Sequence, residues 1–189
     1  MIAIVSYQPA WRDEFLAIGG VLRQALGNLA LRIDHIGSTS VPGLAAKDII
    51  DIQVTTASLG PAIEQALNRV GYKRIEGITQ DHIPPEAAIS TDDWRKWLFK
   101  PAAAQRPVNV HVRRSGRANQ RYAVLFRDYL RAHPATAQAY AQVKEALAKY
   151  HPDDLDAYYD VKDPVCDIII GGAEVWAAAV QWEAGPTDC

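Results

Sequence analysis

The sequence predicts an α/β (α+β) protein in which a mixed β-sheet carries packed helices and the C-terminal part is helical. Segments with strand-like alternation crowd the first two-thirds of the 189 residues, whereas helical apolar spacing prevails from about residue 118. The length and an apolar content of 49% suit one domain with a substantial core. We therefore expect residues 1–189 to form a single domain.

The N-terminal region predicts a helix and then a strand. Apolar residues recur at helical spacing between Pro9 and Gly27, which are suited to flank a helix. This stripe consists of Trp11, Phe15, Ile18, Leu22 and Leu26. Residues 29–36 are expected to be extended, and the small and turn-forming residues 37–43 end that strand.

Two further strands each predict one apolar and one polar face. Alternation in residues 49–55 places Asp51 and Gln53 together on the polar face. Residues 108–112 alternate in the same way, with valines on one face and His111 on the other. We expect these strands and residues 31–36 to share one sheet, with Asp51, Gln53 and His111 on the same side of it.

The segments between these strands complete the first two-thirds of the chain. A helix is expected over residues 61–70, opened by Pro61 and ended by Gly71. Residues 76–93 predict a long functional or mobile loop, and residues 94–100 are extended.

Three helices are predicted in the C-terminal part. The first follows Asn119 and the second follows Pro134. The last is expected to begin at Asp163 and Pro164, which suit an N-cap and a first helical turn.

The composition argues against several classes of partner. A net charge of −2 does not favour nucleic acid, although four arginines lie close together between residues 113 and 121. No apolar run approaches the roughly 20 residues that span a bilayer, and the N-terminus lacks a signal-peptide pattern. Cys166 and Cys189 suggest free thiols. We expect a cytoplasmic protein with neither a nucleic-acid nor a membrane partner.

The segment with the most chemical information is residues 34–52, DHIGSTSVPGLAAKDIIDI. Gly37 lets the backbone approach a ligand, and successive N–H groups in such a turn can bind an anion. Hydroxyl donors and one positive charge follow, from Ser38, Thr39, Ser40 and Lys47. This set suits a nucleotide or another phosphate-bearing small molecule, with Asp51 placed to hold a divalent cation. The alternative is a tight turn followed by a solvated aspartate.

Within this segment, the string from His35 to Asp51 resembles the signature of the GrpB family, which also occurs as a C-terminal domain fused to some dephospho-CoA kinases. The resemblance covers nearly the whole chain, through Trp11, Asn109, His111, residues 125–134, Tyr140 and Lys162. It implies a nucleotidyltransferase-type fold. In that superfamily a Gly-Ser pair contacts a nucleotide triphosphate, and three carboxylates on two later strands hold two magnesium ions.

Carried onto this sequence, the resemblance assigns Gly37 and Ser38 to phosphate binding and Asp51 to the metal. The second acidic position is Gln53, and the later strand offers Asn109 and His111 instead of a carboxylate. Two-metal chemistry depends on clustered carboxylates, and imidazole suits softer metals than magnesium. An ordinary two-magnesium site is therefore not expected. The predicted metal ligands are Asp51, Gln53 and His111, for magnesium or manganese, or alternatively zinc. The predicted catalytic residues are Asp51 and His111.

Two other arrangements stay open. His35, Asp51 and His111 would together form a metal site if their strands are neighbours, or the two histidines are simply hydrogen-bonded near the sheet. Asp81 and His82 would supply a general base or a metal ligand, or they form an exposed loop pair with no role.

The leading functional hypothesis is a protein that binds a nucleotide or a related phosphate ligand and transfers a nucleotidyl group to a small molecule with a divalent metal. The alternative is a non-catalytic phosphate-binding module, favoured by Gln53. A link to coenzyme A metabolism rests on the domain fusion alone. Because no Gly-x-x-x-x-Gly-Lys-Ser/Thr motif occurs, kinase activity is not expected of this chain.

Overall fold

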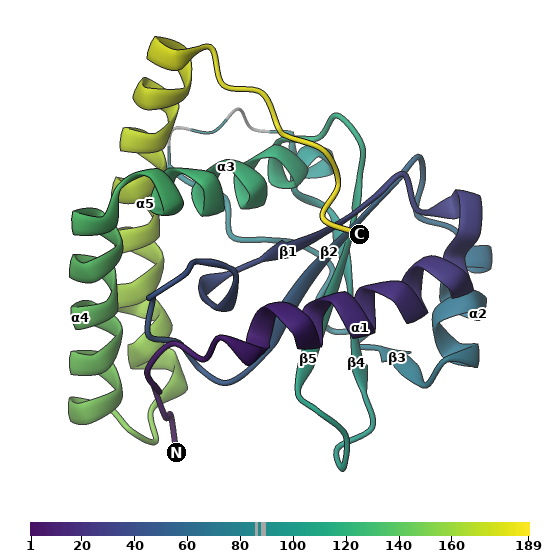
Figure 1. Ribbon diagram of the computed structural model, residues 1–189, viewed down its shortest axis with the longest axis horizontal. Helices are drawn as coiled ribbons and strands as arrows, with labels where there is room; N and C mark the ends of the chain where they lie inside the picture. The colour runs from purple at the N-terminus through teal and green to yellow at the C-terminus, as the bar shows by residue number, and fades with distance from the viewer. Residues whose placement is uncertain (86, 88–89) are drawn as a thin grey trace.

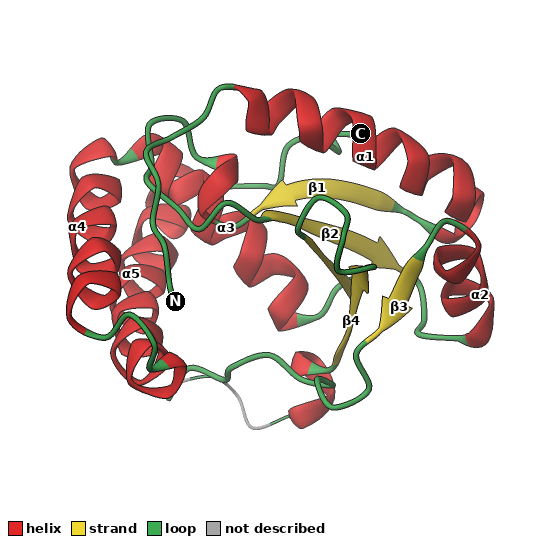
Figure 2. Ribbon diagram, turned by 90° about the horizontal axis from the view of Figure 1, so that it is seen from below, coloured by secondary structure: helices red, strands yellow, loops and turns green. Residues whose placement is uncertain are grey.

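The computed structural model describes residues 1–85, 87 and 90–189. Within them, five strands form one mixed sheet in the order β1-β2-β5-β4-β3 (Figures 1 and 2). The strands are β1 (Arg32–Ile36), β2 (Ile50–Thr56), β3 (Tyr72–Arg74), β4 (Lys96–Pro101) and β5 (Val108–Arg114). The short strand β3 was not predicted, because three residues are too few to show alternation.

The centre of the sheet is the parallel pair β2–β5, in which Asp51 lies opposite Asn109 and Gln53 opposite His111. The outer pairs β1–β2, β4–β5 and β3–β4 are antiparallel. The expected mixed sheet with packed helices is therefore confirmed. The parallel pairing aligns the alternating residues of β2 and β5, so one face of both strands is apolar and the other polar.

The apolar face carries α1 (Ala10–Leu26) and α2 (Pro61–Arg69). Trp11 and Phe15 of α1 are buried against Ile52 of β2 and Val110 of β5. The helical stripe predicted from Trp11 to Leu26 thus packs into the main core. A short 3-10 helix at Gly27–Leu29 follows α1, so β1 begins at Arg32 and not at residue 29.

The polar face is covered by α3 (Ala118–Ala132), which lies on the opposite side of the sheet from α1 (Figure 2). Beside it stand α4 (Pro134–Tyr150) and α5 (Leu155–Val180), which give the helical C-terminal part its own apolar clusters. One of these clusters includes Val41 and Leu44. The segment after the Gly-Ser turn is therefore packed against the helices as well as against the sheet.

The predicted start of the last helix at Asp163 is wrong, because α5 begins at Leu155. The N-cap is Asp154, whose side chain accepts a hydrogen bond of 2.9 Å from the backbone N–H of Ala157. Pro164 lies inside the helix on its exposed side. There, water can satisfy the carbonyl group that loses its N–H partner, so the helix continues through the proline.

The predicted loop over residues 76–93 includes residues 86, 88 and 89, which lie outside the described residues. Its described part is anchored to the sheet. Gln80 forms a bridge with Arg95, and the backbone N–H of Asp81 donates to the carbonyl of Trp94. A 3-10 helix at Thr91–Trp94 then leads into β4. Among the described residues, no helix combines the length and the apolar character needed to cross a membrane.

Candidate functional site

The polar face of β2 and β5 brings Asn109 and His111 together around Asp51. The Nδ2 group of Asn109 donates to Asp51 Oδ1 over 2.8 Å, and His111 Nε2 lies 3.6 Å from the same oxygen. The Asp51 side chain is 27% exposed to solvent. The prediction that Asp51, Gln53 and His111 share one side of the sheet is confirmed, because the parallel register fixes it.

The charges of this pair depend on each other. Burial raises the pKa of the Asp51 carboxyl, but the nearby His111 imidazole and the hydrogen bond from Asn109 outweigh burial and leave the pKa below its usual value. Burial lowers the pKa of His111, and the nearby Arg113 and Lys96 lower it further, against the opposing effect of Asp51. Asp51 is therefore the anionic partner at neutral pH and His111 the neutral one.

Gly37 joins the loop after β1 to Asp51. Its φ of +69° lies in the left-handed region, which favours glycine. A Cβ atom at this position would lie only 2.5 Å from Asp51 Oδ2. Glycine is required here because the carboxylate occupies the space of a side chain. The predicted phosphate loop and the predicted metal carboxylate are in direct contact.

The three hydroxyl groups of the loop point to different partners. Residues Ser38–Ser40 form a 3-10 turn. Thr39 Oγ1 lies 3.0 Å from His35 Nε2, and the Ser40 hydroxyl donates to the carbonyl of Gly37 over 2.6 Å. Ser38 Oγ instead accepts a hydrogen bond of 2.8 Å from Lys144 Nζ. Thr39 and Ser40 thus use their hydroxyls on β1 and on Gly37, whereas Ser38 faces a lysine from α4.

Lys144, on α4, is a site residue that sequence reasoning missed. Its side chain is 2% exposed, and its Nζ also donates to the carbonyl of Ala45 over 2.5 Å. Burial lowers its pKa to about 7, and the neighbouring Lys162 contributes to this. A signal was present in the sequence, because Lys144 falls on the buried stripe of α4 between Tyr140 and Leu147. A lysine on an apolar stripe calls for a specific partner.

Lys47, predicted to contact phosphate, lies beside the same helices. Its Nζ is 4.0 Å from the centre of the Tyr158 ring and 5.1 Å from that of Tyr159. Burial and the nearby Lys162 lower the pKa of Lys47, while Asp51 opposes them. The ammonium group of Lys162 is therefore close enough to affect both Lys47 and Lys144, and Asp51 also acts on both.

Gln53 occupies the position of the second metal carboxylate, but both ends of its amide are engaged. Its Oε1 accepts a hydrogen bond of 2.7 Å from Arg113 Nη1, and its Nε2 donates one of 3.1 Å to the carbonyl of Gln120. The residue is completely buried. A metal ion could reach the amide oxygen only after displacing the guanidinium, so the geometry of Gln53 does not fit a metal ligand.

Asp81 is the centre of an ion-pair network on the same face. Its carboxylate accepts two hydrogen bonds from Arg113, of 2.8 and 2.9 Å. It also accepts one of 2.6 Å from Lys96 and one of 3.0 Å from the amide of Asn119. Burial raises the pKa of its carboxyl, yet Arg113 and Lys96 outweigh burial and hold the pKa well below its usual value. Asp81 is neither an exposed loop residue nor free to act as a base. His82 lies instead 3.0 Å from Asp167 on α5.

The proposed convergence of His35, Asp51 and His111 is wrong. His35 alternates to the apolar face of β1, where its ring stacks on Phe15 with centroids 4.7 Å apart. Burial lowers the pKa of His35 to about 4. The alternative of a hydrogen-bonded histidine near the sheet is confirmed for His35. Residues 1–85, 87 and 90–189 contain no group of three or more histidine, cysteine, aspartate or glutamate side chains spaced to hold a metal ion.

Comparison with protein families shows that the family described as GrpB protein matches residues 1–171. The chain belongs to the GrpB family. It is 30% identical to a solved chain, described as the conserved protein GrpB from Enterococcus faecalis, with a TM-score of 0.72. The match covers 92% of this chain and 99% of that one. The resemblance stated from the sequence is thereby confirmed.

The match covers different shares of two curated relatives. A dephospho-CoA kinase of Mycobacterium tuberculosis is 40% identical over 193 residues, which cover 95% of this chain and 47% of the kinase. A UPF0157 protein of Halalkalibacterium halodurans is 33% identical over 172 residues, covering 89% and 80% respectively. The chain thus spans about half the length of the kinases that it matches.

The four clustered arginines of this GrpB-family chain all have acidic partners. Arg113 binds Asp81, and Arg114 pairs with Asp92. Arg117 Nη1 lies 2.9 Å from Asp93, and Arg121 pairs with Glu174. The local basic cluster seen in the sequence is therefore largely neutralised in the fold, which agrees with the low net charge.

Proposed function

We propose that this GrpB-family protein binds a nucleotide or another phosphate-bearing small molecule at the loop after β1. One observation carries the proposal: the buried ammonium of Lys144 is held 2.8 Å from Ser38 Oγ, in a loop that touches Asp51 through Gly37. Burying a charged lysine costs free energy unless an anionic or hydrogen-bonding partner compensates for the lost hydration. Here its protein partners are a hydroxyl and a carbonyl, which are neutral.

A phosphate group suits the charge balance of this site. Lys162 lies close enough to affect both Lys144 and Lys47, and it pairs with Asp163 at 3.2 Å, whereas Asp51 is the carboxylate that acts on both Lys144 and Lys47. An anionic ligand would restore neutrality by pairing with the ammonium groups. In this arrangement the loop from Gly37 to Ser40 supplies N–H and hydroxyl donors and Lys47 supplies charge, and a bound anion would stabilise the charged form of Lys144 as well.

The residues present fit one divalent ion better than two. Asp51 and His111 offer a carboxylate and an imidazole, whereas Gln53 is engaged by Arg113. Magnesium and manganese commonly combine one or two carboxylates with phosphate oxygens and water. We therefore propose Asp51 and His111 as the protein ligands of a single ion that binds together with the phosphate ligand. Such an ion would neutralise phosphate charge.

If the protein is an enzyme, the reaction is nucleotidyl transfer. The hydroxyl or amine of a small acceptor would form a bond to the α-phosphorus of a nucleoside triphosphate. The bond to the bridging oxygen would break, and pyrophosphate would leave while the acceptor proton passes to solvent. Gln53 favours the second candidate, a module that binds the ligand without this reaction, because its position lacks the carboxylate that two-metal chemistry uses.

Ligand binding is tested first by thermal shift and calorimetry with ATP, GTP, CTP, UTP, dephospho-CoA and CoA, each with magnesium, manganese, zinc or no metal. A ligand at a hundred times its Kd stabilises the fold by about 2.7 kcal/mol, which is easily detected. Ser38→Ala should weaken binding about fivefold, since one hydrogen-bonding group is lost. The control is Ser58→Ala at an exposed turn. Equal affinities of all three proteins would refute the assignment of the loop.

Asp51→Asn separates the enzyme from the module. In an enzyme, the substitution should abolish pyrophosphate release and reduce the effect of the metal on nucleotide binding. In a module, wild type and variant should bind with similar affinity with and without magnesium, and neither should release pyrophosphate. Slightly tighter binding by the variant would also favour the module, because a carboxylate without a cation repels phosphate.

A further inference from the structure

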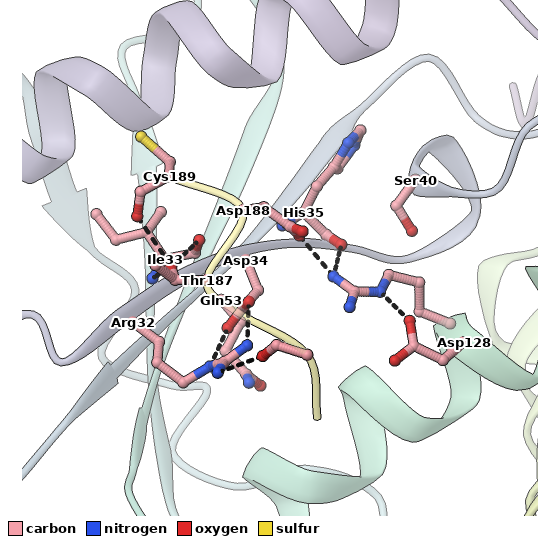
Figure 3. A network of polar contacts seen from close by, with 12 residues as sticks. Arg32, Ile33, Asp34, His35, Ser40, Gln53, Asp128, Thr187, Asp188 and Cys189 are labelled. Atoms are coloured by element: carbon pink, nitrogen blue, oxygen red, sulfur yellow. Dashed lines mark hydrogen bonds and ion pairs between the residues drawn. The ribbon is translucent and has the colours of Figure 1, made fainter. Parts of the chain in front are cut away.

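The outer edge of β1 is covered by residues 185–189, which we call the strap. β1 is the edge strand of the sheet, so its outward N–H and C=O groups need partners other than a strand. After α5 the chain returns across α3 to reach β1 (Figure 1). Figure 3 shows Thr187, Asp188 and Cys189 lying against Ile33 and His35.

The strap and one arginine satisfy all four outward backbone groups of Ile33 and His35. Thr187 Oγ1 accepts from the N–H of Ile33 at 2.9 Å, and the N–H of Cys189 donates to the Ile33 carbonyl at 3.2 Å. Asp188 Oδ2 accepts from the N–H of His35 at 2.9 Å. The His35 carbonyl accepts from Arg127 Nη1 at 3.0 Å. The strap therefore replaces a neighbouring strand.

Asp188 connects this edge to α3. The same Asp188 Oδ2 accepts a hydrogen bond of 2.6 Å from Arg127 Nη1. Asp128 Oδ1 accepts one of 2.7 Å from Arg127 Nε. The Arg127 side chain is only 4% exposed, so its two carboxylate partners are what make its burial tolerable. Removing Asp188 would leave this guanidinium with a single acidic partner and free to turn away from His35.

Arg127 and Arg131 bracket the candidate phosphate loop. They lie one turn apart on α3. Arg127 holds the carbonyl of His35, two residues before Gly37, and Arg131 holds the carbonyl of Ser40 with 3.1 and 2.8 Å hydrogen bonds. Both ends of the turn are therefore attached to one helix, and the strap fixes one of the two attachments.

We propose that Asp188 and Arg127 are positioning residues, through which the strap holds the loop from Gly37 to Ser40 in its ligand-binding conformation. The proposal rests on the proposed function of that loop. It predicts that the strap contributes to affinity through the conformation of the loop, although residues 185–189 make no hydrogen bond to Ser38. The matched comparison is Asp188→Ala with Thr187→Val, because the Thr187 hydroxyl bonds to Ile33 and Cys189 and makes no hydrogen bond to Arg127.

The test combines amide hydrogen exchange with ATP binding, in the presence of magnesium, on the full chain. Exchange is read at Ser40 and Val41, whose N–H groups donate to Gly37 and Ser38 in the turn. Asp188→Ala should remove most of the exchange protection at both amides and weaken ATP binding about tenfold, as expected if the competent loop falls to about a tenth of the population. Thr187→Val should change neither. Arg127→Lys, which cannot hold His35 and Asp188 together, should resemble Asp188→Ala.

The outcomes separate the two proposals. Unchanged exchange at Ser40 and Val41 in Asp188→Ala, or equal acceleration in Thr187→Val, would overturn the positioning role. If wild type binds none of the phosphate ligands, the proposed function fails, and the exchange comparison still decides whether the strap positions the loop. Combining Asp188→Ala with Arg127→Lys should add little to either single effect, because both break the same connection.

Discussion

The buried Lys144 should make the stability of this protein depend on pH in a way that one substitution removes. Its pKa is lowered from 10.5 to about 7 in the folded state, chiefly by burial. As the pH falls below 10.5 the unfolded chain takes up a proton at this lysine, whereas the folded protein does not until about pH 7. The folded state is therefore favoured progressively as the pH rises from 7 towards 10.5.

The magnitude follows from the proton difference. One proton corresponds to about 1.36 kcal/mol per pH unit. Between about pH 7.5 and 9.5 the unfolded state holds nearly one more proton than the folded state at Lys144, which amounts to roughly 2.4 kcal/mol. In Lys144→Met this dependence should be absent, so the stability of wild type minus that of the variant should rise by this amount.

The assay is urea unfolding of both proteins across this pH range, with stabilities obtained by linear extrapolation. Other titrating groups act alike in the two proteins and cancel in the difference. The control is Lys149→Met, which removes an exposed lysine from the same helix. A wild-type minus Lys144→Met difference that is flat between pH 7.5 and 9.5 would refute the reasoning, because Lys144 would then be charged in the fold throughout.

Two further predictions concern the contacts around Asp51 and Asp81. Gly37→Ala should lower the free energy of unfolding by about 1–3 kcal/mol more than Gly43→Ala does. Both positions have positive φ, but only at Gly37 would the added Cβ lie 2.5 Å from Asp51 Oδ2. Equal losses in urea unfolding would contradict the contact. Asp81→Asn should cost about 3 kcal/mol at pH 7, since Arg113 and Lys96 lose their acidic partner. Because the folded-state pKa of Asp81 is depressed, this stabilisation is present above about pH 4 and is lost as the pH falls below it, so wild type and variant should converge in acid.

The sequence alone was enough to predict the features that depend on residues close to one another along the chain. The alternation in β2 and β5 placed Asp51 and His111 on one face, and the spacing from Trp11 to Leu26 defined α1. Gly37 was recognised as a point of close approach, and the structure shows that the neighbour there is Asp51. These features follow from backbone periodicity and from the conformational freedom of glycine, which depend on local residue order.

The tertiary structure alone decided which distant residues complete the site. Lys144 reaches Ser38 across 106 positions of sequence, and Asp188 reaches Arg127 across 61. Asp81 looked like an exposed loop residue until Arg113 and Lys96 were placed around it. The start of α5 was missed because Pro164 is tolerated only on an exposed side of the helix. Each of these depends on how helices pack on the sheet, and contacts between residues far apart in the chain leave no periodic signal in the sequence.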